Sequence, residues 1–201
     1  MPADALVLAT RNQGKLRELA RILGDQVTLA GLDAFPGAPD VPETGATFEA
    51  NALLKARAIA AYAKLPAVAD DSGLCVDALN GMPGVLSARW AGQHGDDQAN
   101  LELVLAQVAD VPDTRLGARF VCAAALVVPA DGVAREWVVT GQVEGRLIRA
   151  PKGTGGFGYD PIFQPDGFTE TTAEMTPEAK DAISHRGRAF RALAPFITAL
   201  I

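Results

Sequence analysis

Residues 5–29 read ALVLATRNQGKLRELARILGDQVTL, and the class of fold to expect follows from this stretch. The five residues 5–9 are all apolar, which is typical of a strand buried on both faces of a parallel or mixed sheet. The spacing of leucine and alanine over 14–23 predicts a helix. A second strand is predicted around 27–29, so the chain opens as a strand–helix–strand unit and its class is α/β.

Patterns along the rest of the chain agree with this class. Further helices are predicted at 47–63, from Asp96 or Asp97 onward, from Thr176-Pro177 to near 184–187, and at 190–200. Further strands are predicted at 67–70, 120–128 and 136–143. Asp71-Ser72-Gly73 is expected to be a turn that ends the strand at 67–70, and Ile162-Phe163 is expected to be extended.

Composition and charge bound the class of protein. The 201 residues predict one domain, or one domain with two lobes, and 49% hydrophobic residues suffice for a sizeable core. The formal net charge of −6 argues against nucleic acid as a partner, because such proteins show a basic face. The longest apolar run, 120–128, is far shorter than the roughly 20 residues that span a membrane.

The two cysteines and the N-terminus bear on location. Cys75 and Cys122 lie in apolar runs and are expected to be buried thiols in a reducing compartment. The first residues lack the basic region of a signal peptide. We therefore expect a cytoplasmic protein with no membrane partner.

Residues 152–163, KGTGGFGYDPIF, hold four glycines within six positions. Gly153, Gly155 and Gly158 fit the dinucleotide-binding spacing, but that motif needs a helix immediately afterwards. Pro161 disfavours helix at Asp160. We expect instead a loop that exposes an aromatic face and a carboxylate; the alternative is a glycine-rich hairpin loop without a ligand.

Two adjacent carboxylates, Asp70 and Asp71, stand at the end of the strand predicted at 67–70. Ligands of α/β proteins bind beyond the carboxyl ends of strands, and a carboxylate there suits Mg²⁺. Side chains alternate along a strand, so the two aspartates should face different ways. The alternative is a turn sequence with no ligand, and the residues alone favour neither interpretation.

Several cationic residues could meet an anion. Lys15 lies in the strand-to-helix turn 10–15, and helix N-termini favour phosphate. Lys55 shares a helical stripe with Phe48, Asn51, Ala52 and Ile59, so it either reaches solvent or meets an anion. Glu43 could be a metal ligand or a solvated loop charge. Lys180 and the pair His185-Arg186 complete the candidates, and the guanidinium suits a keto oxygen or a phosphate.

Six segments, in this order, resemble one family, the inosine/xanthosine triphosphate pyrophosphatases. The matching segments are 9–15, 43–48, 51–56, 69–74, 153–161 and 184–187. The resemblance runs from about residue 5 to the C-terminus. It implies a single domain over 1–201, with a mixed central sheet flanked by helices and two lobes whose cleft holds the active site.

The resemblance also implies a reaction, in which non-standard purine nucleoside triphosphates (ITP, dITP, XTP) are hydrolysed to the monophosphate and pyrophosphate, with Mg²⁺ as cofactor. Asp71 would be catalytic, and Asp71 and Glu43 would hold the metal. Substrate contacts are implied for Thr10, Arg11, Asn12, Gln13, Gly14, Lys15, Lys55, Ser72, Phe157, Gly158, Tyr159, Asp160, Lys180, His185 and Arg186. A homodimer is implied as well.

Within this set, Asn12, Lys15 and Lys55 would hold the phosphates, and Phe157 would stack on the base. His185 and Arg186 would face the purine edge, where a donor suits a 6-keto oxygen and disfavours adenine. Lys180 could serve either the phosphates or the base. Two alternatives are a nucleotide-binding regulatory protein without turnover and a related hydrolase of modified pyrimidine triphosphates. A nucleic-acid-binding module fits the charge least.

Overall fold

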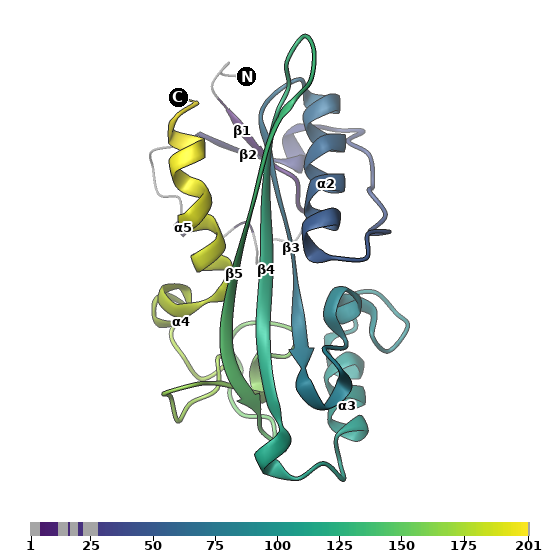
Figure 1. Ribbon diagram of the computed structural model, residues 1–201, viewed down its shortest axis with the longest axis vertical. Helices are drawn as coiled ribbons and strands as arrows, with labels where there is room; N and C mark the ends of the chain where they lie inside the picture. The colour runs from purple at the N-terminus through teal and green to yellow at the C-terminus, as the bar shows by residue number, and fades with distance from the viewer. Residues whose placement is uncertain (1–4, 12–15, 17–19, 22–27, 201) are drawn as a thin grey trace. The chain divides into compact units, whose positions relative to one another are not determined.

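The structure is a computed structural model that describes residues 5–11, 16, 20–21 and 28–200 (Figure 1). Within these residues one sheet has the strand order β2-β1-β3-β4-β5-β6. Its strands are β1 Leu6–Leu8, β2 Leu29–Gly31, β3 Ala67–Val76, β4 Gly117–Val128, β5 Arg135–Leu147 and β6 Phe163–Pro165. Because β1 pairs in parallel with β2 and β3 while β5 and β6 are antiparallel, the predicted mixed sheet is confirmed.

Helices accompany the sheet as predicted, except that the last one begins at His185 and not near 190, so His185-Arg186-Gly187 opens this helix and does not end the one before it. The α-helices are α2 Phe48–Ala63, α3 Asp97–Gln107, α4 Pro177–Ile183 and α5 His185–Thr198. Short 3-10 helices are η2 Leu32–Ala34, η3 Asp77–Leu79, η4 Gly84–Arg89, η5 Asp113–Arg115 and η6 Asp160–Ile162. Most of the helix predicted over 14–23 lies outside the described residues.

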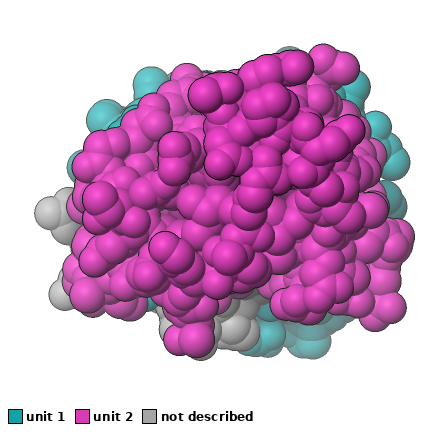
Figure 2. Space-filling model, turned by 90° about the horizontal axis from the view of Figure 1, so that it is seen from below, with its two compact units in different colours: residues 1–71, 122–141, 186–201 teal, residues 72–121, 142–185 magenta. Residues whose placement is uncertain are grey.

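The chain divides into two compact units, coloured separately in Figure 2. Unit 1 comprises 1–71, 122–141 and 186–201, and unit 2 comprises 72–121 and 142–185. In unit 1 the buried residues of β1, β3 and β4 pack with Phe190, Leu193 and Ile197 of α5. In unit 2 a second core joins α3 to strand residues and to Ile162 and Phe163. The predicted active-site cleft between two lobes stays a prediction.

Helix α2 forms where its sequence pattern places it. The Thr47 side chain accepts a hydrogen bond from the backbone N–H of Ala50 and so caps the first turn. Lys64 ends the helix in a left-handed conformation, with φ of 57°. The predicted stripe of Phe48, Asn51, Ala52 and Ile59 is buried. The stripe therefore holds the polar Asn51, and Lys55 beside it, against the interior of unit 1.

The strand β3 corrects a sequence prediction. Asp71-Ser72-Gly73 is not a turn, because β3 continues through it to Val76. A Cβ at Gly73 would overlap the carbonyl oxygen of Gly84 and the Ser87 side chain. Ser87 Oγ accepts from Leu74 N at 2.9 Å and lies 2.7 Å from the Gly84 carbonyl oxygen. Gly73 is thus required by close packing within unit 2 and not by a turn.

Smaller differences concern the boundaries of other strands. The strand predicted around 27–29 lies at Leu29–Gly31. The strand predicted at 120–128 begins earlier, at Gly117. The strand predicted at 136–143 is longer at both ends and spans Arg135–Leu147. Ile162 ends the 3-10 helix η6 and is not extended, although Phe163 is. The 3-10 turn tolerates Pro161 because its pyrrolidine ring occupies an early position, where no helical N–H is needed.

Substituting Gly73→Ala should destabilise the protein by about 1–3 kcal/mol, because the added methyl group overlaps the backbone of Gly84. Chemical denaturation of the purified protein measures this loss. Gly132→Ala is the matched control, since a Cβ there meets nothing within 4 Å. Equal stability of the two variants would show that the packing around Gly73 is not tight.

Candidate active site

Two carboxylates meet one ammonium group in unit 1. Lys55 Nζ, from α2, donates to Glu43 Oε1 at 2.6 Å and to Asp71 Oδ1 at 3.3 Å. Glu43 precedes α2, and Asp71 lies within β3. Lys55 is only partly exposed and is bonded to two carboxylates. Of the two predicted outcomes, solvent or an anion, the structure shows the second. Three predicted site residues are thereby brought together.

Asn51 orients this cluster, although the sequence interpretation did not include it among the site residues. Its side chain is fully buried; Nδ2 donates to Asp71 Oδ2 at 3.0 Å, and Oδ1 accepts from Gly45 N at 2.7 Å. Both ends of the amide are therefore engaged, and the Asp71 carboxylate is held in one orientation. The signal was present in the sequence, since Asn51 precedes Lys55 by four residues on one helix face.

The charges around Lys55 control its protonation. Burial lowers the pKa of Lys55, but the negative charges of Asp71, Asp70 and Glu43 outweigh that effect, and the net pKa is raised above its usual value. The ammonium is therefore protonated at all physiological pH values. A fixed positive charge here favours the ionised form of both carboxylates.

Asp70 has different partners from its neighbour Asp71. Arg186 Nε donates to Asp70 Oδ2 at 3.2 Å, and the Cys122 thiol lies 4.0 Å from the same oxygen. Asp70 is buried and Arg186 is 2% exposed. Because side chains alternate along β3, one aspartate joins this buried ion pair while the other joins the lysine cluster, as predicted. Cys75 and Cys122 are both buried, also as predicted.

The cluster suits a divalent cation that is shared with a ligand. Glu43 Oε1 and Asp71 Oδ1 both accept from Lys55 Nζ, and carboxylate oxygens are the ligands Mg²⁺ prefers. Over the part of the chain that the structure describes, no group of three or more His, Cys, Asp or Glu side chains could hold a metal ion. Mg²⁺ can bind through only one or two protein carboxylates, because water and phosphate oxygens complete its shell.

A second group of predicted residues lies together in unit 2. Lys180 Nζ donates to Asp160 Oδ2 at 2.5 Å and lies 5.2 Å from the centre of the Phe157 ring. The Phe157 ring is exposed, as the glycine-rich sequence predicted. Gly158 N donates to Asp97 Oδ2 at 2.8 Å. Asp97, at the start of α3, was not among the predicted site residues, and no local pattern singled it out.

Two other predicted residues in unit 2 are buried. The hydroxyl of Tyr159 donates to the Ser87 carbonyl at 2.8 Å, and burial raises the pKa of Tyr159 well above its usual value. The His185 ring stacks on Phe120, with centroids 4.9 Å apart. Tyr159 thus anchors its loop through its side chain. The substrate contact implied for either residue stays a prediction.

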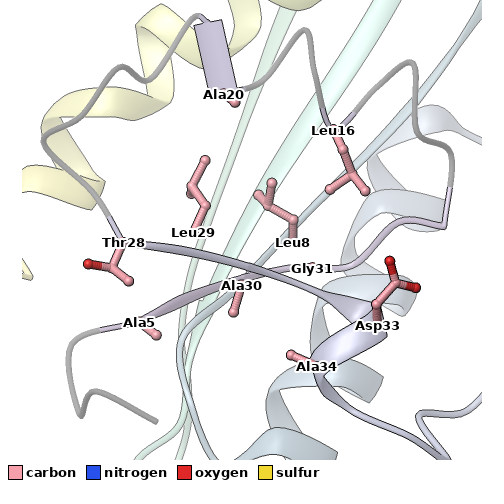
Figure 3. Close-up of a pocket in the computed structure, with 10 residues that line it drawn as sticks. All are labelled: Ala5, Leu8, Leu16, Ala20, Thr28, Leu29, Ala30, Gly31, Asp33 and Ala34. Carbon is pink, nitrogen blue, oxygen red and sulfur yellow. The ribbon is translucent and has the colours of Figure 1, made fainter.

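The remaining predicted residues are placed as follows. Thr10 N donates to the Leu8 carbonyl, Arg11 donates to the Ala38 carbonyl at 2.9 Å, and Ser72 is partly buried within β3. Asn12, Gln13, Gly14 and Lys15 lie outside the described residues. A pocket of about 500 Å³ in unit 1 is lined mainly by apolar side chains of and near β1 and β2, such as Leu8 and Leu29 (Figure 3). None of its described lining residues is a predicted site residue.

The mixed sheet and the lysine–carboxylate cluster define an α/β protein equipped with the groups that bind metal ions and phosphates in hydrolases. More specifically, the chain belongs to the Ham1 family, whose sequence model matches residues 6–196. Together with the relatives described next, this match confirms the resemblance drawn from the six motifs.

Individual relatives agree over nearly the whole chain. A dITP/XTP pyrophosphatase of Streptomyces coelicolor is 63% identical over 199 residues, which cover 98% of each protein. The crystal structure of a nucleoside-triphosphatase / dITP/XTP pyrophosphatase from Mycobacterium abscessus is 57% identical with a TM-score of 0.78, covering 95% of this chain and 99% of that one. A HAM1 protein structure from Coxiella burnetii is 40% identical with a TM-score of 0.87, covering 97% and 98%.

Among the described residues, no helix has both the length and the apolar character needed to cross a membrane.

Proposed function

We propose that this protein hydrolyses non-standard purine nucleoside triphosphates (ITP, dITP and XTP) to the monophosphate and pyrophosphate. The observation that carries the proposal is the meeting of Glu43 and Asp71 on the Lys55 ammonium. Relatives that share more than half of the sequence are named dITP/XTP pyrophosphatases, which supports the same substrates here. The role in the cell would be to remove such nucleotides from the pool.

Asp71 is the proposed catalytic residue. Its carboxylate is buried, oriented by Asn51 and bonded to the Lys55 ammonium, and a carboxylate so placed can accept a proton from water. Attack on the α phosphorus requires a water molecule in line with the leaving pyrophosphate, and a carboxylate held in one orientation contributes to that alignment. The fixed hydrogen bond from Asn51 Nδ2 therefore has a positioning function.

Mg²⁺ is the proposed cofactor, held by Asp71 and Glu43. When bound, the ion would neutralise charge on the phosphates and acidify a water molecule. Lys55 contributes a second, permanent positive charge beside the two carboxylates. We assign it to the phosphates, together with Asn12 and Lys15 of the 10–15 segment.

The base would be recognised by Phe157 of the second group together with His185 and Arg186, as the family resemblance implies. Phe157 presents an exposed ring on which a purine can stack. His185 and Arg186 are proposed to face the purine edge, where donors pair with a 6-keto oxygen and leave adenine without a partner. A homodimer in the cytoplasm is part of the proposal; buried thiols such as Cys75 and Cys122 are suited to a reducing compartment.

Product analysis with the purified protein and Mg²⁺ tests the proposed reaction. We expect pyrophosphate from ITP, dITP and XTP, and a rate at least about a hundredfold lower with ATP, since the 6-amino group of adenine would leave buried donors unpaired. Release of orthophosphate, or equal use of ATP, would contradict the proposal. Preferential use of modified pyrimidine triphosphates would identify the related hydrolase instead, and tight binding without turnover would identify a regulatory binder.

A further inference from the structure

The Asp160 carboxylate is buried and bonded to the protein's own groups. It is 3% exposed, and its two oxygens receive three donors from three segments of unit 2. Thr172 Oγ1 donates to Oδ1 at 2.7 Å, while Phe157 N, at 2.8 Å, and Lys180 Nζ, at 2.5 Å, donate to Oδ2. A carboxylate accepts about four hydrogen bonds. Three internal donors and near-complete burial leave Asp160 poorly suited to contact a substrate directly.

The glycines of the loop make this arrangement possible. Gly156 has φ of 72°, and a Cβ there would overlap Asp160 Oδ2. Gly153 has φ of 81°, and a Cβ there would overlap the Ala173 backbone, whose carbonyl also accepts from Gly155 N at 2.9 Å. These glycines let the loop pack onto Asp160 and Ala173, which accounts for them without a phosphate cradle.

Lys180 connects Asp160 to the exposed ring. Its ammonium contacts the Asp160 carboxylate and lies over one face of the Phe157 ring, 5.2 Å from the centre. A cation at this distance is attracted to the ring face. A base that stacks on Phe157 must therefore use the opposite face. Asp160 also accepts a hydrogen bond from Phe157 N. It therefore restrains Phe157 in two ways, through its backbone and, by way of Lys180, at one face of its ring.

We propose that Asp160 is a positioning residue for purine recognition, acting through Phe157 and Lys180. It restrains the backbone that carries the ring and keeps the Lys180 ammonium on one face, so that the other face receives the base. This inference rests on the proposed function. It assigns Lys180 to the base and not to the phosphates, and it replaces the direct substrate contact implied for Asp160 by the sequence.

Two ligands separate a positioning role from a general structural one. IMP carries the base with one phosphate, and inorganic tripolyphosphate carries the phosphates alone. With Asp160→Asn, the Kd for IMP should rise about tenfold, which is the size expected when aromatic stacking is impaired. The Kd for tripolyphosphate should change less than about twofold. Calorimetry on the full chain with Mg²⁺ measures both constants.

Thr171→Val is the matched structural control. Thr171 is the neighbour of Thr172 and is equally buried, but its hydroxyl donates to the Lys152 carbonyl and not to Asp160. This variant should change neither Kd by more than about twofold. The proposal would be overturned if Asp160→Asn raised the Kd for IMP and the Kd for tripolyphosphate by similar factors. It would also be overturned if Thr171→Val raised the Kd for IMP as much as Asp160→Asn does.

Two further variants make the test independent of how well Asp160→Asn folds. Lys180→Met should raise the Kd for IMP several-fold and leave the Kd for tripolyphosphate unchanged. The reverse pattern would assign Lys180 to the phosphates and overturn the proposal. In a Phe157→Leu background, Asp160→Asn should weaken IMP by less than about twofold, because its effect passes through the ring. A full tenfold loss in that background would show that Asp160 acts in another way.

The same measurements separate this inference from the proposed function. A wild-type protein that neither binds IMP nor hydrolyses dITP would overturn both. A wild-type protein that does both, combined with Asp160→Asn affinities equal to wild type, would overturn the positioning role alone.

Discussion

Replacing Asp71 with Asn should lower kcat for dITP by about a thousandfold, within the range expected for loss of a general base or of a charged group that stabilises the transition state. The amide cannot accept a proton from water and is a poorer ligand for Mg²⁺ than a carboxylate. Steady-state assays of pyrophosphate release with the purified variant measure the loss.

Nucleotide binding should survive this substitution, because Lys55 and Glu43 remain paired and the ring of Phe157 is in the other unit. A Kd for dITP within about tenfold of wild type would separate lost chemistry from lost binding. Asp77→Asn serves as control: it changes an exposed aspartate paired with Arg119, and surface pairs contribute little. Turnover by Asp71→Asn within tenfold of wild type would remove Asp71 from the catalytic role.

The aspartate-to-asparagine substitution at Asp70 should lower the free energy of unfolding. Asp70→Asn removes the carboxylate that pairs with Arg186, whose guanidinium is buried. Breaking a buried ion pair from one side costs about 3–5 kcal/mol, because the remaining buried charge loses that carboxylate. The expected loss of unfolding free energy is about 3 kcal/mol, and the midpoint of urea denaturation measures it.

Asp71→Asn is the matched comparison for stability, since it makes the same chemical change in the same strand. Its cost should be smaller, because Lys55 keeps Glu43 as a partner. The double variant Asp70→Leu/Arg186→Met should recover much of the stability lost in Asp70→Asn, as buried pairs often can be replaced by apolar groups. A midpoint for Asp70→Asn equal to wild type would show that this ion pair does not stabilise the fold.

Local patterns predicted most of the elements in this protein. Apolar runs predicted β1 and β3, and the Thr47 and Thr176 caps predicted the starts of α2 and α4, because strand burial and helix capping depend on residues close in sequence. The Asp71-Ser72-Gly73 prediction was wrong for the opposite reason. Gly73 packs against Gly84 and Ser87, and a local pattern cannot predict contacts with residues that lie beyond it in the sequence.

For the candidate site, the residue types were predictable and their partners were not. The motifs at 43–48, 51–56 and 69–74 identified Glu43, Lys55 and Asp71 through family resemblance. Which atoms meet depended on the packing of α2 against β3, which places Asn51 and Lys55 on opposite oxygens of one carboxylate.

The chain's own residues thus establish the α/β class, the helix caps, the buried strands and the chemical types available for phosphate and metal binding, since these follow from short-range periodicity and side-chain chemistry. Three-dimensional packing assigns their roles. It pairs Asp70 with Arg186 across 116 positions, gives Asp71 to Lys55, and turns Asp160 inward to hold its own loop. Such assignments depend on distances between segments remote in sequence, and these distances exist only once both units have folded.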